Sequence, residues 1–327
     1  MFRRTLAAVV ATSGAVLLAT LSGPRVAASS AQIERIGGRD RYETAALVGE
    51  RFPVGSEVYI ASGENFPDSL AAGPAAGRTQ SPILLVTHNS IPDVTQNELR
   101  RIAPGEITVV GGPAAIGDQV LAQLQTFTQG PVQRLAGDDR YGTAIAIDEN
   151  AFTAGVQKLA ITTGRDFPFA LVLGTVGALI SAPLLLVDGH TLTPAEAAEI
   201  TRLAPKEIWV VGDATVISDA VVTQIAQLEP TTRYGAAPYD QSAHVWAKQD
   251  PNVGLSVILV TGASYPDGLS AAGLAGLAPG RLTYVVPTEC VPPVVVSEIT
   301  RLQPPHITLI GGPAALSTNG ENLVPCS

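Results

Sequence analysis

The feature that most constrains the fold of this chain is a threefold internal repeat. Three segments share one pattern, in which an apolar run ends in a glycine turn: Glu106–Ile116, Glu207–Ile217 and His306–Leu316. They lie 101 and 99 residues apart, so a unit of about 100 residues is written three times. The period predicts three copies of one folding unit, and differences between the copies show which residues that unit can lose.

Each copy repeats the same order of elements. An Arg-Tyr pair and a helical stretch precede a strand, a Gly-x-x-aromatic-Pro turn and a small-residue helix; a second strand, a further helix and the glycine-turn strand follow. The strands, for example Ile83–Val86 and Leu184–Val187, are continuous apolar runs, which is typical of strands covered by helices on both faces.

The predicted fold class is therefore α/β. We expect three tandem three-layer modules, at residues 33–130, 131–229 and 230–327, each with an open parallel sheet flanked by helices. Ligands of such sheets bind at the carboxyl ends of the strands, where the repeated turns are expected to lie.

Residues 1–28 have the order of a secretory signal peptide. Arg3 and Arg4 precede an apolar run that ends before the small residues Val26-Ala27-Ala28. The alternative is a retained membrane anchor, but the run is shorter than the roughly 20 residues of a membrane span. We expect cleavage after Ala28 and an exported protein.

The chain is acidic, with a formal net charge of −9. Cleavage would remove three arginines and no acid, so the charge would fall to −12. Such a protein is a poor nonspecific ligand for nucleic acid or for anionic lipid. An anionic ligand would have to be held by a local group of cations.

The two cysteines, Cys290 and Cys326, both lie in the third copy. A single pair in an exported protein predicts a structural disulfide. A metal-binding or catalytic thiol is the weaker interpretation, because no histidine stands at a matching spacing.

In combination, the repeated motifs resemble the cell wall-binding repeat 2 family. They are Gly-x-Asp-Arg-Tyr, Gly-x-Asn-Phe-Pro-Asp, Pro-Ile-Leu-Leu and Ile-Thr-Val-Val-Gly-Gly, and they extend over nearly the whole chain after residue 28. The resemblance implies Toprim-like modules in a pseudo-threefold arrangement within a monomer. It also implies a secreted protein of a Gram-positive bacterium that attaches noncovalently to the cell wall through an anionic wall polysaccharide.

The resemblance also implies which residues bind the polymer. They belong to the Ile-Leu-Leu segments and the Arg-Tyr pairs: Ile83, Leu84, Leu85, Leu184, Leu185, Leu186, Arg41, Arg140 and Arg233. Each has a structural alternative, since the apolar residues suit core strands. The arginines suit ion pairs between modules or contacts with Asp40 and Asp139 at a helix start.

The copies are not equivalent. The third has Arg281-Leu282-Thr283-Tyr284 at the Ile-Leu-Leu position and lacks Gly-x-Asp before its Arg-Tyr pair. The second has Phe169 where the others have Asp68 and Asp267. We therefore expect two fuller binding sites and one structural module.

Two smaller motifs allow competing interpretations. Asp68 and Asp267 follow a proline and precede a helix, which predicts helix N-caps. The turns at Gly111-Gly112 and Gly311-Gly312 suit either a tight bend or a phosphate cradle of backbone N–H groups, although Asp213 places an acid at the corresponding turn of the second copy.

Nothing in the sequence predicts catalysis. The four histidines belong to no metal-binding or nucleophile–base motif, so we expect no enzyme activity, cofactor or metal. The alternative to wall attachment is a self-assembling structural envelope protein whose modules mediate protein–protein contacts.

Overall fold

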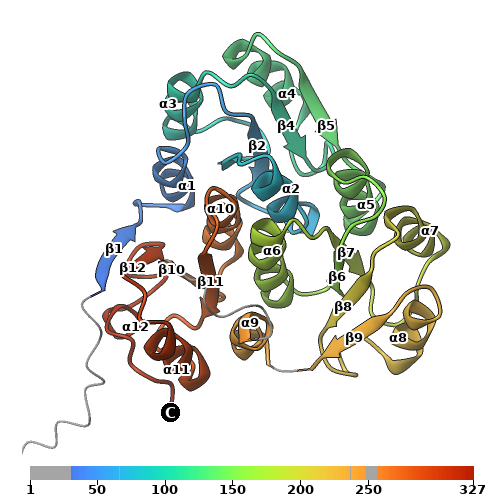
Figure 1. Cartoon of the computed structure of the whole chain (residues 1–327). Helices are drawn as coiled ribbons and strands as arrows, with labels where there is room; N and C mark the ends of the chain where they lie inside the picture. Colours follow the sequence, from blue (N-terminus) through green and yellow to red (C-terminus); the bar gives the residue numbers. More distant parts are fainter. Residues whose placement is uncertain (1–30, 66, 236, 248–255) are drawn as a thin grey trace, which may run out of the picture.

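A computed structural model describes residues 31–65, 67–235, 237–247 and 256–327. This part of the chain forms three parallel sheets of four strands, flanked by helices, and so confirms the predicted α/β fold (Figure 1). The predicted signal peptide, residues 1–28, lies outside the described residues. Within them, no helix has the length and hydrophobicity that a membrane crossing requires.

Corresponding strands occupy corresponding places in the three sheets. The first sheet has the order β3 (Ile83–Val86), β2 (Val58–Ser62), β4 (Ile107–Val110), β5 (Val132–Leu135). The second has the order β7 (Leu184–Val187), β6 (Lys158–Thr163), β8 (Glu207–Val211), β9 (Thr231–Tyr234). The third has the order β11 (Arg281–Val286), β10 (Ser256–Thr261), β12 (His306–Ile310), β1 (Gln32–Ile36).

Among the residues that the structure describes, four helices accompany each sheet. They are α1 (Arg41–Gly49), α2 (Ala72–Arg78), α3 (Asp93–Ile102) and α4 (Asp118–Leu124) in the first module. The second module has α5 (Arg140–Ala151), α6 (Pro168–Ile180), α7 (Pro194–Leu203) and α8 (Asp219–Ala226). The third has α9 (Pro238–Ala247), α10 (Tyr265–Gly276), α11 (Pro293–Leu302) and α12 (Thr318–Glu321). The first module also contains two short 3-10 helices, η1 (Pro67–Ser69) and η2 (Gln125–Phe127).

Burial on both faces explains the continuous apolar strands. In β3, Ile83 and Leu85 face the inner core with α1 and α2, while Leu84 and Val86 face the outer core with α3 and α4. Successive side chains of a strand point to opposite faces, so a strand between two helix layers is apolar at every position.

The sheets are offset by one strand from the sequence repeat. The strand that opens the second repeat, β5, pairs with β4 of the first module, and β9 pairs with β8 of the second. By the same rule β1, at the start of the described chain, pairs with β12 of the third module, so the first and last strands are neighbours (Figure 1). The N-terminal strand therefore closes a ring of three modules.

Three helices, one from each module, meet at the centre of this ring. α2, α6 and α10 pack against one another, and Figure 1 shows them between the three sheets. Their facing positions are small: a Cβ built on Gly276 would lie 2.2 Å from the Gly77 Cα. Close approach of helix backbones is possible only because these side chains are absent.

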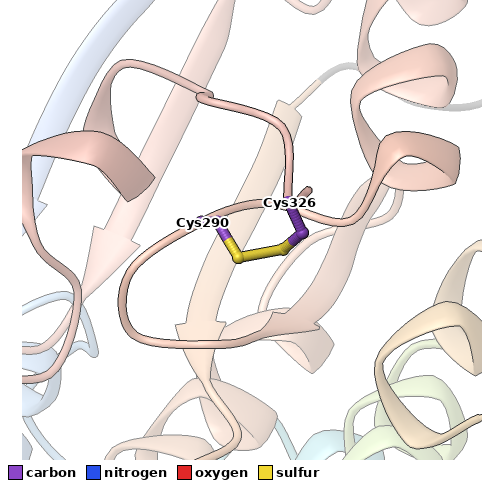
Figure 2. The surroundings of a disulfide bond; sticks show 2 residues. All are labelled: Cys290 and Cys326. Carbon is purple, nitrogen blue, oxygen red and sulfur yellow. A yellow bond between two sulfur atoms is a disulfide. The ribbon is translucent and has the colours of Figure 1, made fainter.

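The predicted disulfide is confirmed (Figure 2). Cys290, in the loop between β11 and α11, is bonded to Cys326, with a Cα–Cα distance of 5.0 Å. The C-terminal segment runs back along this loop, where the Cys326 N–H donates to the Val291 carbonyl at 3.0 Å. The bond thus ties the C-terminal segment to a loop at the carboxyl end of the third sheet.

Candidate functional site

The repeated turns meet at the carboxyl ends of the sheets. Gly63, Gly164 and Gly262 directly follow β2, β6 and β10, and a tyrosine ring lies against each of them. A Cβ on Gly63 would lie 2.5 Å from Cε1 of Tyr42, and one on Gly262 would lie 2.3 Å from Cε1 of Tyr239. The aromatic residue that opens each first helix therefore requires glycine at the end of the strand beneath it.

The Gly-x-Asp-Arg-Tyr motif is a helix start. Asp40 caps α1 by accepting from the Glu43 N–H at 2.9 Å, and Asp139 caps α5 by accepting from the Tyr141 and Gly142 N–H groups. A carboxylate at this position satisfies helix donors that have no partner within the helix. The two aspartates thus fix the helix start from which Arg41 and Arg140 project.

Arg41 and Arg140 occupy equivalent places. Arg41 donates from a terminal nitrogen to the Gly63 carbonyl, and Arg140 donates to the Gly164 carbonyl at 2.5 Å. The guanidinium of Arg41 therefore lies at the carboxyl end of β2, and that of Arg140 lies at the carboxyl end of β6. Arg41 is exposed and Arg140 is half-buried.

The environment of Arg41 includes residues of the neighbouring module. α1 packs on α10, which carries Tyr265 and Asp267. Burial raises the pKa of Asp267 to about 6, and the positive charge of Arg41 opposes this rise. Burial likewise raises the pKa of Tyr265 to about 12, against the charge and hydrogen bond of Arg41. Arg41 is thus part of the boundary between the first and third modules.

The other two boundaries differ from each other. At the boundary of the first and second modules, α5 with Arg140 packs on η1, which carries Asp68. At the boundary of the second and third modules, α9 packs on α6. Here α9 begins with Pro238 in place of the arginine, and α6 has Phe169 in place of the aspartate. Both charged residues are therefore lost at the same boundary.

The expected equivalence of Arg233 with Arg41 and Arg140 is wrong. Arg233 lies on β9, not at a helix start, and corresponds to Arg35 on β1 and Arg134 on β5. Each of these three arginines donates to the carbonyl of the glycine that follows the neighbouring strand of its sheet. Each also forms an ion pair with an acid on the helix that follows that neighbouring strand: Glu321 for Arg35, Asp118 for Arg134 and Asp219 for Arg233. The arginine at this position therefore connects a strand to a helix within one module.

The uniform spacing of these three arginines was the missed signal in the sequence. Arg35, Arg134 and Arg233 are separated by 99 residues each. The tyrosine equivalent to Tyr42 and Tyr141 is Tyr239, because the third copy is one residue shorter before its first helix.

The six Ile-Leu-Leu residues are core residues. Ile83, Leu84 and Leu85 in β3, and Leu184, Leu185 and Leu186 in β7, are all 0% exposed. Their side chains do not reach the surface, so they contribute to a binding site only by shaping the strand that supports it.

Two smaller expectations were wrong. α10 has Ser264 as its N-cap and α2 has Ala71, so neither Asp267 nor Asp68 is an N-cap. The carboxylates instead lie against the glycine turns: a Cβ on Gly311 would be 2.6 Å from Asp267 Oδ2. An acid beside the turn disfavours the phosphate-cradle interpretation.

The loops after β3 and β7 each hold a histidine, His88 and His190. The His88 N–H donates to Glu64 at 2.7 Å, and the His190 N–H donates to Asp188 at 2.8 Å. Asp188 is also paired at 2.6 Å with Arg165, which directly follows Gly164, the residue whose carbonyl accepts from Arg140. In the described part of the chain no three His, Cys, Asp or Glu side chains are grouped as a metal site.

Comparison with known proteins shows the family to which these modules belong. The model of the cell wall binding domain 2 family matches residues 35–121 and 134–222, which together make up more than half of the chain and include Arg41 and Arg140.

Two curated relatives come from Bacillus subtilis (strain 168). The amidase enhancer is 25% identical over 292 residues, which is 88% of this chain and 39% of that protein. The N-acetylmuramoyl-L-alanine amidase LytC is 25% identical over 245 residues, which is 74% of this chain and 48% of the enzyme. The chain thus spans less than half the length of either relative.

Solved structures support the same fold. Cwp6 from Clostridium difficile superposes with a TM-score of 0.81 at 21% identity, over 91% of this chain and 48% of Cwp6. Cwp8 from the same organism has a TM-score of 0.78 at 20% identity, over 89% of this chain and 51% of Cwp8. With its repeated motifs in three modules of this fold, the chain belongs to the cell wall binding domain 2 family, which supports its association with a cell wall.

Proposed function

We propose that this protein attaches noncovalently to the cell wall by holding acidic groups of a wall polymer at the carboxyl ends of its first two sheets. Arg41 and Arg140 are the principal cations in this proposal. The observation that carries it is their recurrence at one place in the two modules that the family model matches.

The chemistry of arginine supports this assignment. A guanidinium carries five N–H donors in a planar fork that matches two oxygens of a phosphate or carboxylate. Contacts with the Gly63 and Gly164 carbonyls hold the two guanidinium groups at the strand ends, where an acidic group of a polymer would meet them. A net charge of −9 repels anions in general, so binding depends on such local cations.

The number of sites supports attachment to a repetitive ligand. Two modest sites on one rigid body gain avidity, because binding at one raises the effective concentration at the other. Arg233 serves within its own module, so the proposal has two principal sites, not three.

We further propose that the protein has no catalytic activity of its own. The relatives with amidase in their names are more than twice as long as the segment they share with this chain. Their similarity coincides with the modules that the wall-binding family describes.

Capture by washed, protein-stripped cell walls tests the proposal. We expect the mature chain to bind, high salt to release it, and extraction of the acidic polymer to abolish capture. Arg41→Gln and Arg140→Gln should each weaken binding about tenfold and the double variant about a hundredfold, as expected for charged hydrogen bonds at two linked sites. Lys206→Gln, at the opposite end of the second sheet, is the charge-matched control.

Three outcomes would count against parts of the proposal. Undiminished capture after polymer extraction would exclude the polymer as ligand, and self-association of the chain would then favour the structural alternative. Full capture by the double variant would exclude Arg41 and Arg140. Time-dependent release of soluble wall fragments would contradict the absence of catalysis.

A further inference from the structure

The third module contains a cavity of about 510 Å³ at the amino ends of β1, β10 and β12. Its wall includes residues of the closing strand β1, Arg51 just after α1, and residues of the third module, so the cavity lies where the ring closes. Its size falls within the 300–1,000 Å³ typical of small-ligand sites.

Strand register places different side chains at the corresponding positions of the three sheets. One row of paired residues crosses the inner face of each sheet: Tyr59, Thr108 and Gln133 in the first; Ala160, Trp209 and Thr232 in the second; Ile258, Thr308 and Glu34 in the third. The first two rows contain a buried aromatic ring, whereas the third has none.

Tyr59 and Trp209 place large aromatic rings in this row of the first two modules. Tyr59 is 3% exposed and Trp209 is 2% exposed. The ammonium group of Lys158 lies 4.0 Å from the centre of the Trp209 ring. Ile258 and Thr308, at the corresponding positions of the third sheet, are smaller than these rings, and both line the cavity.

Basic side chains line the cavity. Arg51, Arg281 and His306 all contribute to its wall, and Arg51 is paired with Glu34. Arg281 is half-buried and donates to the Leu274 carbonyl at 3.1 Å. Among the described residues it makes no ion pair with a carboxylate. Burial and the nearby charge of Arg51 lower the pKa of Arg281. A bound anion would offset both effects.

The remaining lining combines polar and apolar groups. Glu34, Thr308, Gln32 and Ser256 offer hydrogen-bonding groups around the cations. Ile258 and Leu274 supply an apolar wall. This combination suits a small hydroxylated molecule that carries one acidic group.

We propose that this cavity binds a negatively charged sugar unit, with its phosphate or carboxylate on Arg281 and Arg51 and its hydroxyl groups on Glu34 and Thr308. The site belongs to the third module alone and is independent of Arg41 and Arg140. It gives a binding role to the module that departs most from the repeated motifs.

Calorimetric titration of the mature chain tests the proposal, with glucose 6-phosphate and glucuronate as probes and glucose as the neutral comparison. We expect at least one charged sugar to bind and glucose not to bind. Arg281→Gln should weaken binding at least tenfold. Thr308→Trp and Ile258→Tyr should abolish it by restoring the ring that the second or first module carries.

Controls keep the result interpretable. Arg301→Gln on α11 removes the same charge outside the cavity and should leave binding unchanged. Circular dichroism and thermal unfolding should show that each variant is folded, and Ile258→Tyr provides a second filling variant. The proposal would be overturned if neither charged sugar bound at millimolar concentration. Unchanged binding by a folded Thr308→Trp variant would also overturn it.

The source of the sugar acid is resolved by repeating wall capture with Arg281→Gln. Reduced capture with Arg41 and Arg140 intact would identify the ligand as a unit of the wall polymer. Unchanged capture of a variant that no longer binds the charged sugars in the calorimetric titration would identify the ligand as a free sugar acid. Failure at Arg41 and Arg140 would leave this titration unaffected, so the two proposals are tested separately.

Discussion

At the scale of single residues, the most informative group is Arg41 with its neighbours on α10. The arginine lies at the proposed polymer site and also near Asp267, a carboxylate with a pKa of about 6. An ionised Asp267 competes with any external anion for the charge of Arg41. The site and the module boundary are therefore coupled through one arginine.

This coupling predicts pH-dependent wall capture. As the pH falls from 7.5 to 5, Asp267 gains a proton, its negative charge disappears, and capture should strengthen several-fold. Asp267→Asn should bind at pH 7.5 about as well as the parent does at pH 5, with a flatter profile measured by the capture assay. An equal pH dependence in both proteins would contradict the coupling.

The raised pKa of Asp267 makes its contribution to stability fall as the pH rises, whereas the contribution of a salt-bridged acid grows with pH. Because the folded state holds the proton more tightly, the contribution of Asp267 is fully present below its ordinary pKa of about 4 and is lost as the pH rises through about 6. This contribution has to be measured alongside binding, by thermal unfolding at both pH values.

At the scale of single elements, β1 decides how the chain closes. Its partner β12 lies at the other end of the chain: Arg35 donates to the Gly311 carbonyl, 276 residues away. The Gly311 N–H in turn donates to the Ile36 carbonyl at 2.8 Å. The third sheet is therefore completed by residues at the start of the first sequence repeat.

Deleting β1 should loosen the third module more than the first. A chain beginning at Gly37 loses the partner of β12, and we expect faster hydrogen exchange in residues 306–312. Residues 107–112, whose partner β5 is retained, are the internal control. Faster exchange confined to the first module would show that β1 does not complete the third sheet.

The disulfide compensates for a shortened helix. Val120 and Leu124 anchor α4, and Val221 and Ile225 anchor α8, whereas in α12 only Gly320 is buried. A glycine supplies no apolar side chain, so α12 contributes little to the core. The bond between Cys290 and Cys326 holds the C-terminal segment by covalent means instead.

Replacing both cysteines by serine should destabilise the third module. Closing a loop of 36 residues is worth roughly 4 kcal/mol in the chain-entropy model. We expect a lower midpoint in thermal unfolding, and a similar fall in the parent protein under reducing conditions. Equal midpoints with and without the bond would contradict a stabilising role.

At the scale of the whole molecule, three modules are held together by small residues at the centre. Gly77 of α2 faces α6, where its Cβ would lie 2.5 Å from the Ala178 Cα. The same glycine faces Gly276 of α10. Because the close contacts involve backbone atoms, a larger side chain cannot be accommodated by a rotamer change alone.

Gly77→Val should therefore destabilise the assembly of modules. Overpacking at such a site costs about 3 kcal/mol, and we expect a lower unfolding midpoint and easier proteolysis between modules. Gly112→Val is the control, because a Cβ there meets no atom within 4 Å. Similar losses in both variants would indicate a general effect of valine, not central packing.

The threefold α/β architecture, the buried strands and the disulfide could all be predicted from the sequence. These are local or periodic properties: continuous apolar strands report burial on both faces, and Cys290 and Cys326 are the chain's only cysteines. The sequence also identified Arg41 and Arg140 as matching residues, because both copies keep the same helix-start motif.

How the copies meet could not be predicted and became visible in the folded chain. The pairing of β1 with β12, the approach of Arg41 to Asp267 and the cavity beside Arg281 all join segments more than 200 residues apart. Arg233 was misassigned for a related reason, since its Arg-Tyr dipeptide is identical but its place on β9 is set by strand pairing. Such contacts depend on how modules pack, and no local pattern in the chain encodes that packing.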